Sequence, residues 1–234
     1  MSTTRDLAAQ DCASDLAEDI RLVVYRQLST SGRAPTTAEI ATIVGAPPGA
    51  VEQALRALHE RRDLVLGTGG EVVMAHPFAT IPLGFSVMGA HVLWWGGCAW
   101  DSFAIPHLVP GEATVLVATT CPGCGTPHAF VVERDRPPTG PQVAHFLTPT
   151  SRMWDDVVKS CAHQRIFCDE SCLDDWLTAT SNQRGYAMDL ATLWRLARGW
   201  YRGRLERGYQ RREQSEALEY FREVGLSGPF WGLA

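Results

Sequence analysis

The apolar positions of residues 1–60 recur at helical spacing. Residues 16–28 and 49–60 each place apolar side chains three and four positions apart, which predicts two helices with one buried face. Between them, Thr36 and Glu39 stand in the positions of a capping box, so a short helix is expected to run from there to Val44. The N-terminal part of the chain is therefore predicted to be helical.

A glycine-rich turn follows the third predicted helix. Residues 63–66 and 71–74 are strand-like, and the segment between them is rich in glycine, which predicts a β-hairpin. Three helices followed by a hairpin are typical of a winged helix, a variant of the helix-turn-helix. The third helix would read DNA in such a module, but its basic residues cluster at its C-terminal end and Glu52 and Glu60 intervene. A packing or dimerisation role is therefore at least as well supported, and DNA is not the expected partner.

The rest of the chain alternates strand-like and helix-like segments. Strands are expected at residues 84–88, 91–95, 113–118, 129–133 and 142–147. Helices are expected at residues 151–159, from Asp169 onward, at 190–207 and at 215–224, and the apolar segment 229–231 is expected to dock on the body. Arginines interleave with the apolar positions of the helix at 190–207, and we interpret them as a solvated face. They are Arg195, Arg198, Arg202, Arg204 and Arg207, with Arg211 and Arg212 following.

This succession of segments predicts an α+β protein. We expect a winged-helix-like helical module at residues 1–75 and a catalytic core at residues 76–205, built on a mixed or antiparallel sheet with flanking helices. Residues 206–234 would form a helical C-terminal extension. A chain of 234 residues is long enough to bury a substantial core in this way.

Composition places the chain among ordinary globular proteins and narrows its partners. Hydrophobic residues make up 45% and charged residues 20% of the sequence, and the net charge of -5 gives no general attraction to nucleic acid or anionic membrane. No apolar run is long enough to span a bilayer, and the polar N-terminus lacks the apolar stretch of a signal peptide. A cytoplasmic location is expected. In a reducing compartment, the seven cysteines indicate metal or thiolate chemistry and not a disulfide framework.

Four cysteines have the spacing of a structural zinc site. Cys121 and Cys124 flank Pro122-Gly123 in a zinc-knuckle sequence, and Cys168 and Cys172 stand four apart at the start of a predicted helix. A knuckle followed by such a pair supplies four sulfur ligands, which matches a closed tetrahedral site. The alternative is four reduced thiols that pack near one another without a metal.

The segment from Trp94 to Asp101 places a thiol and a carboxyl three residues apart in an apolar run. If Cys98 opens a helix, the two side chains share a face, and the helix dipole would lower the pKa of the thiol. Poor solvation among tryptophans would raise the pKa of Asp101, so this residue could carry a proton. Cys161 is left without a zinc role, whereas Cys12 in the polar leader is interpreted as incidental. A buried free cysteine beside a capping aspartate remains the simpler interpretation of Cys98.

Three segments of the chain resemble the organomercurial lyase (alkylmercury lyase) family. The first runs from Ala75-His76-Pro77-Phe78 to Cys98-Ala99-Trp100-Asp101, the second is the knuckle Cys121-Pro122-Gly123-Cys124-Gly125, and the third is Ser160-Cys161-Ala162-His163. The resemblance extends from about the second predicted helix to Leu205. It departs from the family pattern at Gly96-Gly97 and at Trp100, which puts the size of the substrate in question.

The resemblance implies an enzyme that cleaves a carbon–mercury bond by protonolysis. The family's catalytic roles fall on Cys98, Asp101 and Cys161: the two thiolates take mercury, and the acid moves a proton to the leaving carbon. The products would be a hydrocarbon and Hg(II) held by Cys98 and Cys161. Low-molecular-weight thiols or a mercury reductase would accept the metal, and no organic cofactor is needed.

Two other functions fit the same sequence. A metal- or thiol-responsive regulator would use the N-terminal module to bind DNA in a salt-dependent manner. A homologue within the lyase family would act on a different carbon–heteroatom bond in biosynthesis. We retain both as alternatives to the organomercurial lyase.

Overall fold

Three helices form the N-terminal part of the protein. The computed structural model describes residues 3–234, and for residues 3–13, which include Cys12, it describes the backbone alone. Helix α1 (Thr3–Ser31) is longer at both ends than the segment predicted from the apolar spacing. Helix α2 (Thr37–Val44) begins at the expected capping box, and α3 (Pro48–Glu60) buries the expected apolar face.

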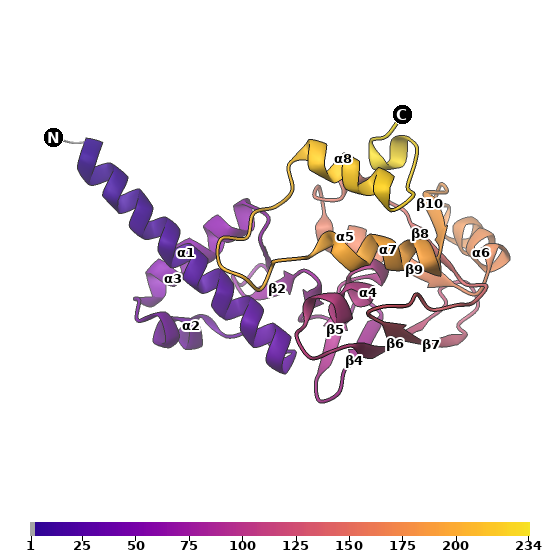
Figure 1. Cartoon of the computed structure of the whole chain (residues 1–234), viewed down its shortest axis with the longest axis horizontal. Coiled ribbons are helices and arrows are strands. Elements are labelled where there is room, and N and C mark those ends of the chain that lie inside the picture. Colours follow the sequence, from indigo (N-terminus) through magenta and orange to yellow (C-terminus); the bar gives the residue numbers. More distant parts are fainter. Residues whose placement is uncertain (1–2) are drawn as a thin grey trace.

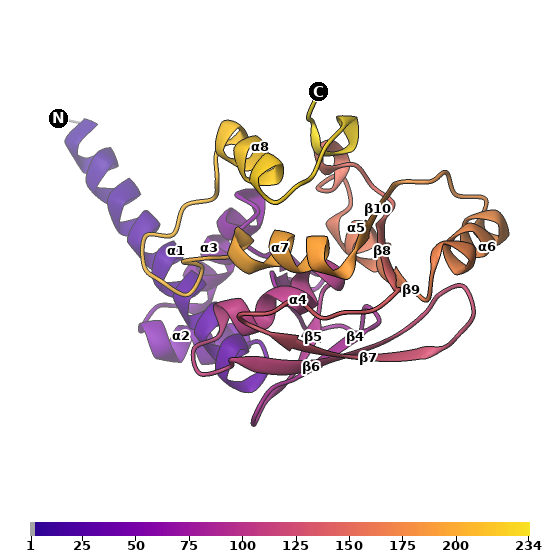
Figure 2. The ribbon, with the colours of Figure 1, turned by 45° about the vertical axis from the view of Figure 1, so that its right-hand side comes forward.

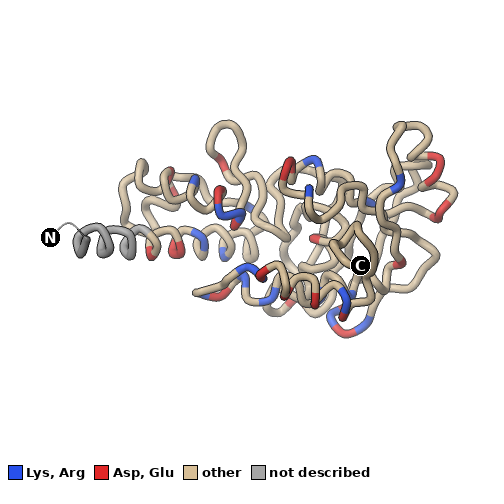
Figure 3. Tube along the Cα trace, turned by 90° about the horizontal axis from the view of Figure 1, so that it is seen from above, with Lys and Arg blue, Asp and Glu red and all other residues tan. Residues whose placement is uncertain are grey.

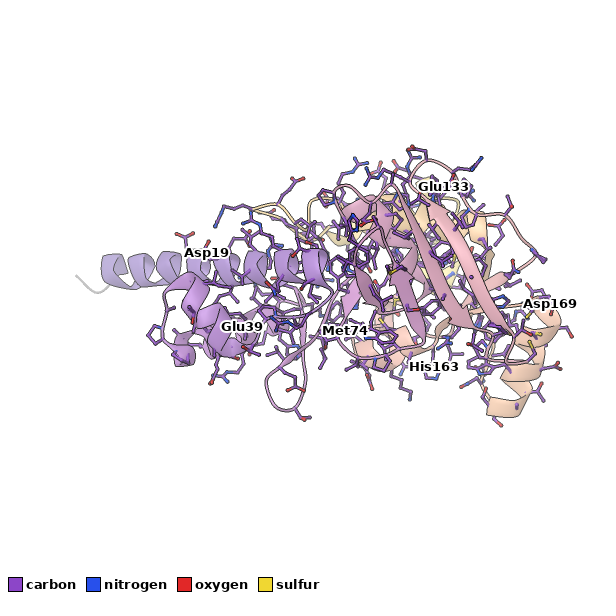
Figure 4. All side chains as sticks on the ribbon, turned by 90° about the horizontal axis from the view of Figure 1, so that it is seen from below. Asp19, Glu39, Met74, Glu133, His163 and Asp169 are labelled. Carbon is purple, nitrogen blue, oxygen red and sulfur yellow. The ribbon has the colours of Figure 1, made fainter. Side chains whose placement is uncertain are left out.

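A seven-stranded antiparallel sheet follows, and the predicted hairpin is part of it. Its strands lie in the order β1-β2-β3-β5-β4-β6-β7. They are β1 (Val65–Leu66), β2 (Val72–Ala75), β3 (Phe78–Ala79), β4 (Phe85–Met88), β5 (Leu93–Gly96), β6 (Thr114–Thr120) and β7 (Pro127–Glu133). The hairpin β1-β2 is therefore continuous with the large sheet through β3, so the N-terminal module shares its sheet with the rest of the chain. Figure 4 shows buried Met74, on β2, at the junction of the two parts.

A second, smaller sheet carries the residues that follow β7. It has the order β10-β8-β9, with β8 (Val143–Phe146), β9 (Gln164–Phe167) and β10 (Tyr186–Asp189). Strand β9 was not expected from the sequence. It runs between α5 (Val157–Ala162) and α6 (Glu170–Thr180), which places Cys161 just before the strand and Cys168 just after it.

Two predicted helices have different bounds from those expected. The segment predicted at 151–159 is a short 3-10 turn, η1 (Thr150–Arg152), and α5 begins only at Val157 because the Asp156 side chain caps it there. The helix predicted at 190–207 is α7 (Leu190–Trp200), which ends seven residues early. Residues 201–207 are turns, in which Gly203 takes a φ of 82° that a glycine adopts without strain.

Helix α4 (Ala99–Leu108) is the central element of the molecule. All its residues from Ala99 to Pro106 are buried, including the polar side chains of Asp101 and Ser102. Figure 2 shows α4 between the large sheet and α7, with α8 (Gln214–Glu223) outermost. The first catalytic segment proposed from the sequence therefore lies in the core.

The C-terminal extension crosses the body on the side away from the large sheet (Figure 1). Helix α8 packs there, and the 3-10 turn η2 (Pro229–Trp231) inserts Trp231, whose side chain is fully buried, as the sequence predicted. The α+β class is confirmed. Among the described residues, no helix combines the length and apolar character that crossing a membrane requires.

Candidate active site

Cys98 lies at the turn from strand β5 into helix α4. It is the N-cap of α4, and its sulfur accepts a hydrogen bond of 3.3 Å from the backbone N–H of Asp101. Two glycines make this turn possible. A Cβ on Gly96 would lie 2.0 Å from Oγ of Ser102, and a Cβ on Gly97 would lie 2.3 Å from Oδ2 of Asp101. The departure at Gly96-Gly97 therefore has a steric reason, because an added Cβ would meet Ser102 at the first glycine and the Asp101 carboxyl at the second.

Asp101 is fully buried in the first turn of α4. Its Oδ1 accepts a hydrogen bond of 2.5 Å from the hydroxyl of Tyr201, and its Oδ2 lies 4.0 Å from Sγ of Cys161. One carboxylate oxygen is thus held by a neutral donor, while the other faces a thiol. The carboxyl is positioned without a direct ion pair to any described side chain.

Cys161 comes from α5 and is brought against the first segment. Its Sγ lies 3.5 Å from Nε2 of His76, which precedes β3. The possible ligand atoms of His76, Asp101 and Cys161 all lie within 4.8 Å of one another. His76, Asp101 and Cys161 therefore form one buried cluster, and the buried side chain of Cys98 lines the same cavity as these three residues.

The two thiols differ in acidity. Burial, followed by the hydrogen bond with Cys161 and the charge of Asp101, raises the pKa of Cys98 well above its usual value. The pKa of Cys161 is lowered, first by the hydrogen bond from Cys98 and then by contact with His76, against the effect of burial. The expected lowering of the Cys98 pKa by the helix dipole was therefore wrong. The N–H of Asp101 does favour the Cys98 thiolate, but the loss of hydration outweighs it.

His76 and Tyr201 belong to this cluster and were not predicted as site residues. Burial opposes the charged form of His76, but the charges of Asp101 and Cys161 raise its pKa. The only local signal for His76 was its place in the Ala75-His76-Pro77-Phe78 segment, and Tyr201 stood in an aromatic run that indicated nothing more than core packing. Both are recognised only from contacts made across the fold.

A cavity of about 550 Å³ opens from the cluster, and Cys98, Asp101 and Cys161 all line it. Trp100 forms part of its wall. The indole lies with its ring centroid 4.9 Å from that of Trp200 and 6.0 Å from that of Trp231. Trp100, at which the chain departs from the family pattern, therefore packs against the C-terminal extension, and the extension closes one side of the cavity.

The four cysteines of the expected zinc site also come together, away from this cavity. The sulfurs of Cys121, Cys124, Cys168 and Cys172 all lie within 4.8 Å of one another. The knuckle packs tightly on the start of α6, because a Cβ on Gly123 would lie 2.2 Å from the carbonyl oxygen of Cys172. Figure 4 shows Asp169, the N-cap of α6, at the end of the molecule opposite α1.

Fold and site together define an enzyme-like centre for a soft, thiophilic element, because two buried thiols and a buried carboxyl line one cavity. The family model for alkylmercury lyase (MerB) matches residues 78–202, more than half of the chain. The chain belongs to the alkylmercury lyase family and is a carbon–mercury-cleaving enzyme of that type.

Comparison with solved structures agrees on the fold. A structure described as the mercury-bound form of MerB2 superposes with a TM-score of 0.60 at 16% sequence identity, covering 78% of this chain and 88% of that one. No curated protein sequence gives a significant match. The matched segment contains Cys98, Asp101 and Cys161, whereas the extension from residue 206 lies outside it.

Proposed function

We propose that the protein cleaves organomercurial compounds by protonolysis, with Cys98, Asp101 and Cys161 as its catalytic residues. The observation that carries this proposal is that the buried side chains of Cys98, Asp101 and Cys161 line one cavity, where Asp101 and Cys161 form a cluster with His76. A soft metal prefers thiolate ligands, and a buried carboxyl next to them can deliver a proton without exchange with bulk water.

Cys161 is the first nucleophile in this scheme. His76 lies 3.5 Å from its sulfur and stabilises the thiolate, and the pKa of Cys161 is lowered. Its sulfur forms a bond to mercury and displaces the thiolate that the substrate brought with it. Cys98, whose pKa is raised, still holds its proton at this stage.

Cys98 then supplies both the second sulfur ligand and the proton. As its sulfur bonds to mercury, the thiol proton passes to Asp101 and from there to carbon, which takes the electron pair of the breaking carbon–mercury bond. One thiol, one thiolate and R–Hg–SR′ thus give R–H, R′S⁻ and Hg(II) bridged by Cys98 and Cys161. Low-molecular-weight thiols or a mercury reductase would remove the metal, and no organic cofactor takes part.

Release of benzene from phenylmercury in the presence of excess thiol tests this function directly. Folded protein that releases no hydrocarbon would refute it. Replacing Asp101 by asparagine separates the steps, since Asp101→Asn keeps both thiols but cannot carry the proton. This variant should bind Hg(II) and fail to release benzene, and full activity would remove Asp101 from the mechanism.

We further propose that Cys121, Cys124, Cys168 and Cys172 hold a structural zinc ion. A tetrahedral site with zinc–sulfur bonds of about 2.3 Å needs sulfurs roughly 3.8 Å apart. The observed spacing fits this, with Cys124 and Cys168 at 3.4 Å and all four sulfurs within 4.8 Å. The apolar cluster beneath the site is small, so a metal cross-link would join the β6–β7 hairpin to α6 where little core is available.

The cysteines of both sites must stay reduced, which requires a reducing compartment, and we propose the cytoplasm.

A further inference from the structure

Arginines line the cavity above the reaction centre. Arg62, Arg204, Arg211 and Arg212 all contribute to its wall, and Asp101 is the only carboxyl among the lining residues. Figure 3 shows basic and acidic positions interspersed along much of the chain, so this one-sided lining is unlike the rest of the molecule. The sequence had led us to interpret Arg204, Arg211 and Arg212 as a solvated face, and for the buried Arg204 this interpretation was wrong.

Arg204 is a buried cation that forms no ion pair with any carboxylate among the described side chains. Its side chain is 5% exposed, and it donates hydrogen bonds to the hydroxyl of Tyr25 at 2.8 Å, to the carbonyl of His76 at 3.0 Å and to the hydroxyl of Tyr209 at 3.2 Å. All three acceptors are neutral. Its guanidinium lies 4.8 Å from the ring centroid of Tyr201, the residue that holds Asp101. A buried charge is normally paired, so this one indicates a partner that enters from the cavity.

Arg211 and Arg62 flank a single tryptophan at the same cavity. Their guanidinium carbons lie 5.1 Å and 5.5 Å from the ring centroid of Trp154. Neither forms an ion pair with a described carboxylate. Arg211 donates one long hydrogen bond of 3.3 Å to the carbonyl of Arg61, whereas Arg212 donates two shorter ones to backbone carbonyls at the end of α7 and so has a structural role.

We propose that this part of the cavity is an anion subsite, in which Arg204 and Arg211, with Arg62 beside them, bind a carboxylate carried by the organomercurial substrate. Guanidinium groups match a carboxylate in both charge and geometry, and the aromatic wall suits a flat apolar group between the carboxylate and the mercury. The carboxylate can belong to the organic group or to the thiolate ligand of mercury. All three arginines lie outside residues 78–202, which match the family model. The inference rests on the proposed lyase function.

Arg211→Gln tests the subsite, since Arg211 is only half-buried and its replacement leaves Arg204 in place. Three substrate pairs are compared: 4-mercuribenzoate with 2-mercaptoethanol, phenylmercury with mercaptoacetate, and phenylmercury with 2-mercaptoethanol as the neutral reference. In Arg211→Gln, kcat/KM for a pair that carries a carboxylate should fall about tenfold relative to kcat/KM for the neutral pair. This is the effect expected of one lost charge-assisted hydrogen bond. A fall with 4-mercuribenzoate assigns the carboxylate to the organic group, and a fall with mercaptoacetate assigns it to the thiol.

Arg202→Gln is the matched control, because Arg202 is exposed at the end of α7 and does not line the cavity. It should leave the ratios between the substrate pairs unchanged. If Arg211→Gln also leaves them unchanged, the subsite is overturned. Benzene release by the wild type is scored separately, so that its absence counts against the lyase function alone.

A binding measurement makes the test independent of turnover. Benzoate and its neutral analogue benzamide are titrated against the wild type, with the fluorescence of the cavity tryptophans as the signal. Benzoate should bind at least tenfold more tightly than benzamide, and Arg211→Gln should reduce the difference about tenfold. Equal binding of the two compounds to the wild type would overturn the subsite even in an active lyase.

Discussion

Tyr201 and Asp101 are 100 positions apart in the sequence, and the Tyr201 hydroxyl donates a hydrogen bond of 2.5 Å to Oδ1 of Asp101. Both side chains are buried. Burial, together with the charge of Asp101, raises the pKa of Tyr201 well above its usual value, so the phenol remains a donor at neutral pH. The bond holds the carboxyl in one orientation, with Oδ2 toward Cys161.

Tyr201→Phe should therefore slow proton delivery without preventing metal binding. The ring and its packing are retained, but Oδ1 of Asp101 loses its donor and the carboxyl is free to rotate. The hydrogen bond of a charged group is worth about 1.5–3 kcal/mol, which corresponds to a roughly 10- to 100-fold decrease in kcat. Single-turnover benzene release measures this, with Hg(II) stoichiometry measured in parallel. Tyr220→Phe is the control, since that hydroxyl bonds to backbone groups of α7 and should leave kcat unchanged.

Gly97→Ala should damage the site through one added methyl group. The new Cβ would lie 2.3 Å from Oδ2 of Asp101 and 2.6 Å from Cε of Met74, so the carboxyl has to move. Overpacking of this kind costs about 1–3 kcal/mol of folding stability, and the displaced acid should lower kcat as well. Urea unfolding and hydrocarbon release measure the two effects.

Gly49→Ala is the matched control for that substitution. Gly49 lies in α3, and nothing is within 4 Å of an added Cβ there. Because alanine favours a helix over glycine, this variant should be equally active and up to about 1 kcal/mol more stable. A Gly97→Ala protein that behaves like Gly49→Ala would show that the close approach of Asp101 is not required.

His76→Asn should move the acidic limb of the pH–rate profile to higher pH. The enzyme needs the Cys161 thiolate, so kcat/KM falls as pH drops through the pKa of that thiol. His76 is one of the groups that lower this pKa, and its loss raises the pKa and shifts the limb upward. The pH dependence of iodoacetamide alkylation at Cys161 should shift in the same direction. His91→Asn, at an exposed loop position, should change neither profile, and an unshifted limb in His76→Asn would remove the imidazole from thiol activation.

Features set by neighbouring residues were predictable from the sequence. Thr36 and Glu39 cap α2 as expected because the capping box needs only residues three positions apart. Cys98 caps α4 for the same reason, and the knuckle brings Cys121 and Cys124 together through its own turn. The strands also followed from alternating apolar positions, apart from short or atypical ones such as β3 and β9.

Features set by contacts across the fold were not predictable. The helical spacing of apolar residues continues past Trp200. No local feature of the sequence therefore predicted that α7 ends there, or that Arg204 is buried. His76 contacts Cys161 although 85 positions separate the two residues in the sequence. The pattern of a single sequence does not predict which residues meet over such a separation. The direction of the Cys98 pKa shift was predicted wrongly. The helix dipole can be inferred from neighbouring residues, whereas burial depends on the whole fold.

Trp100→Leu should loosen the C-terminal extension. Trp100 stacks within an aromatic group that includes Trp231 and Phe221 of the extension, and leucine would leave much of that volume empty. The expected loss is about 2–4 kcal/mol in urea unfolding, together with faster proteolysis within residues 206–234. Trp95→Leu removes the same ring from a side chain that is 39% exposed, and it should cost far less. Equal losses in the two variants would contradict a structural link between Trp100 and the extension.

Cys124→Ser and Cys161→Ser should have opposite effects on zinc and on catalysis. Wild-type protein purified without chelator should contain about one zinc ion per chain, and Cys124→Ser should lose it because serine is a poor ligand for this metal. The loss should lower the thermal midpoint, since the β6–β7 hairpin and α6 share only a small apolar cluster. Cys161→Ser lies at the other cluster and should keep its zinc while losing benzene release. Zinc-free wild-type protein of undiminished stability would contradict the structural metal, and loss of zinc from Cys161→Ser would contradict the separation of the two cysteine clusters.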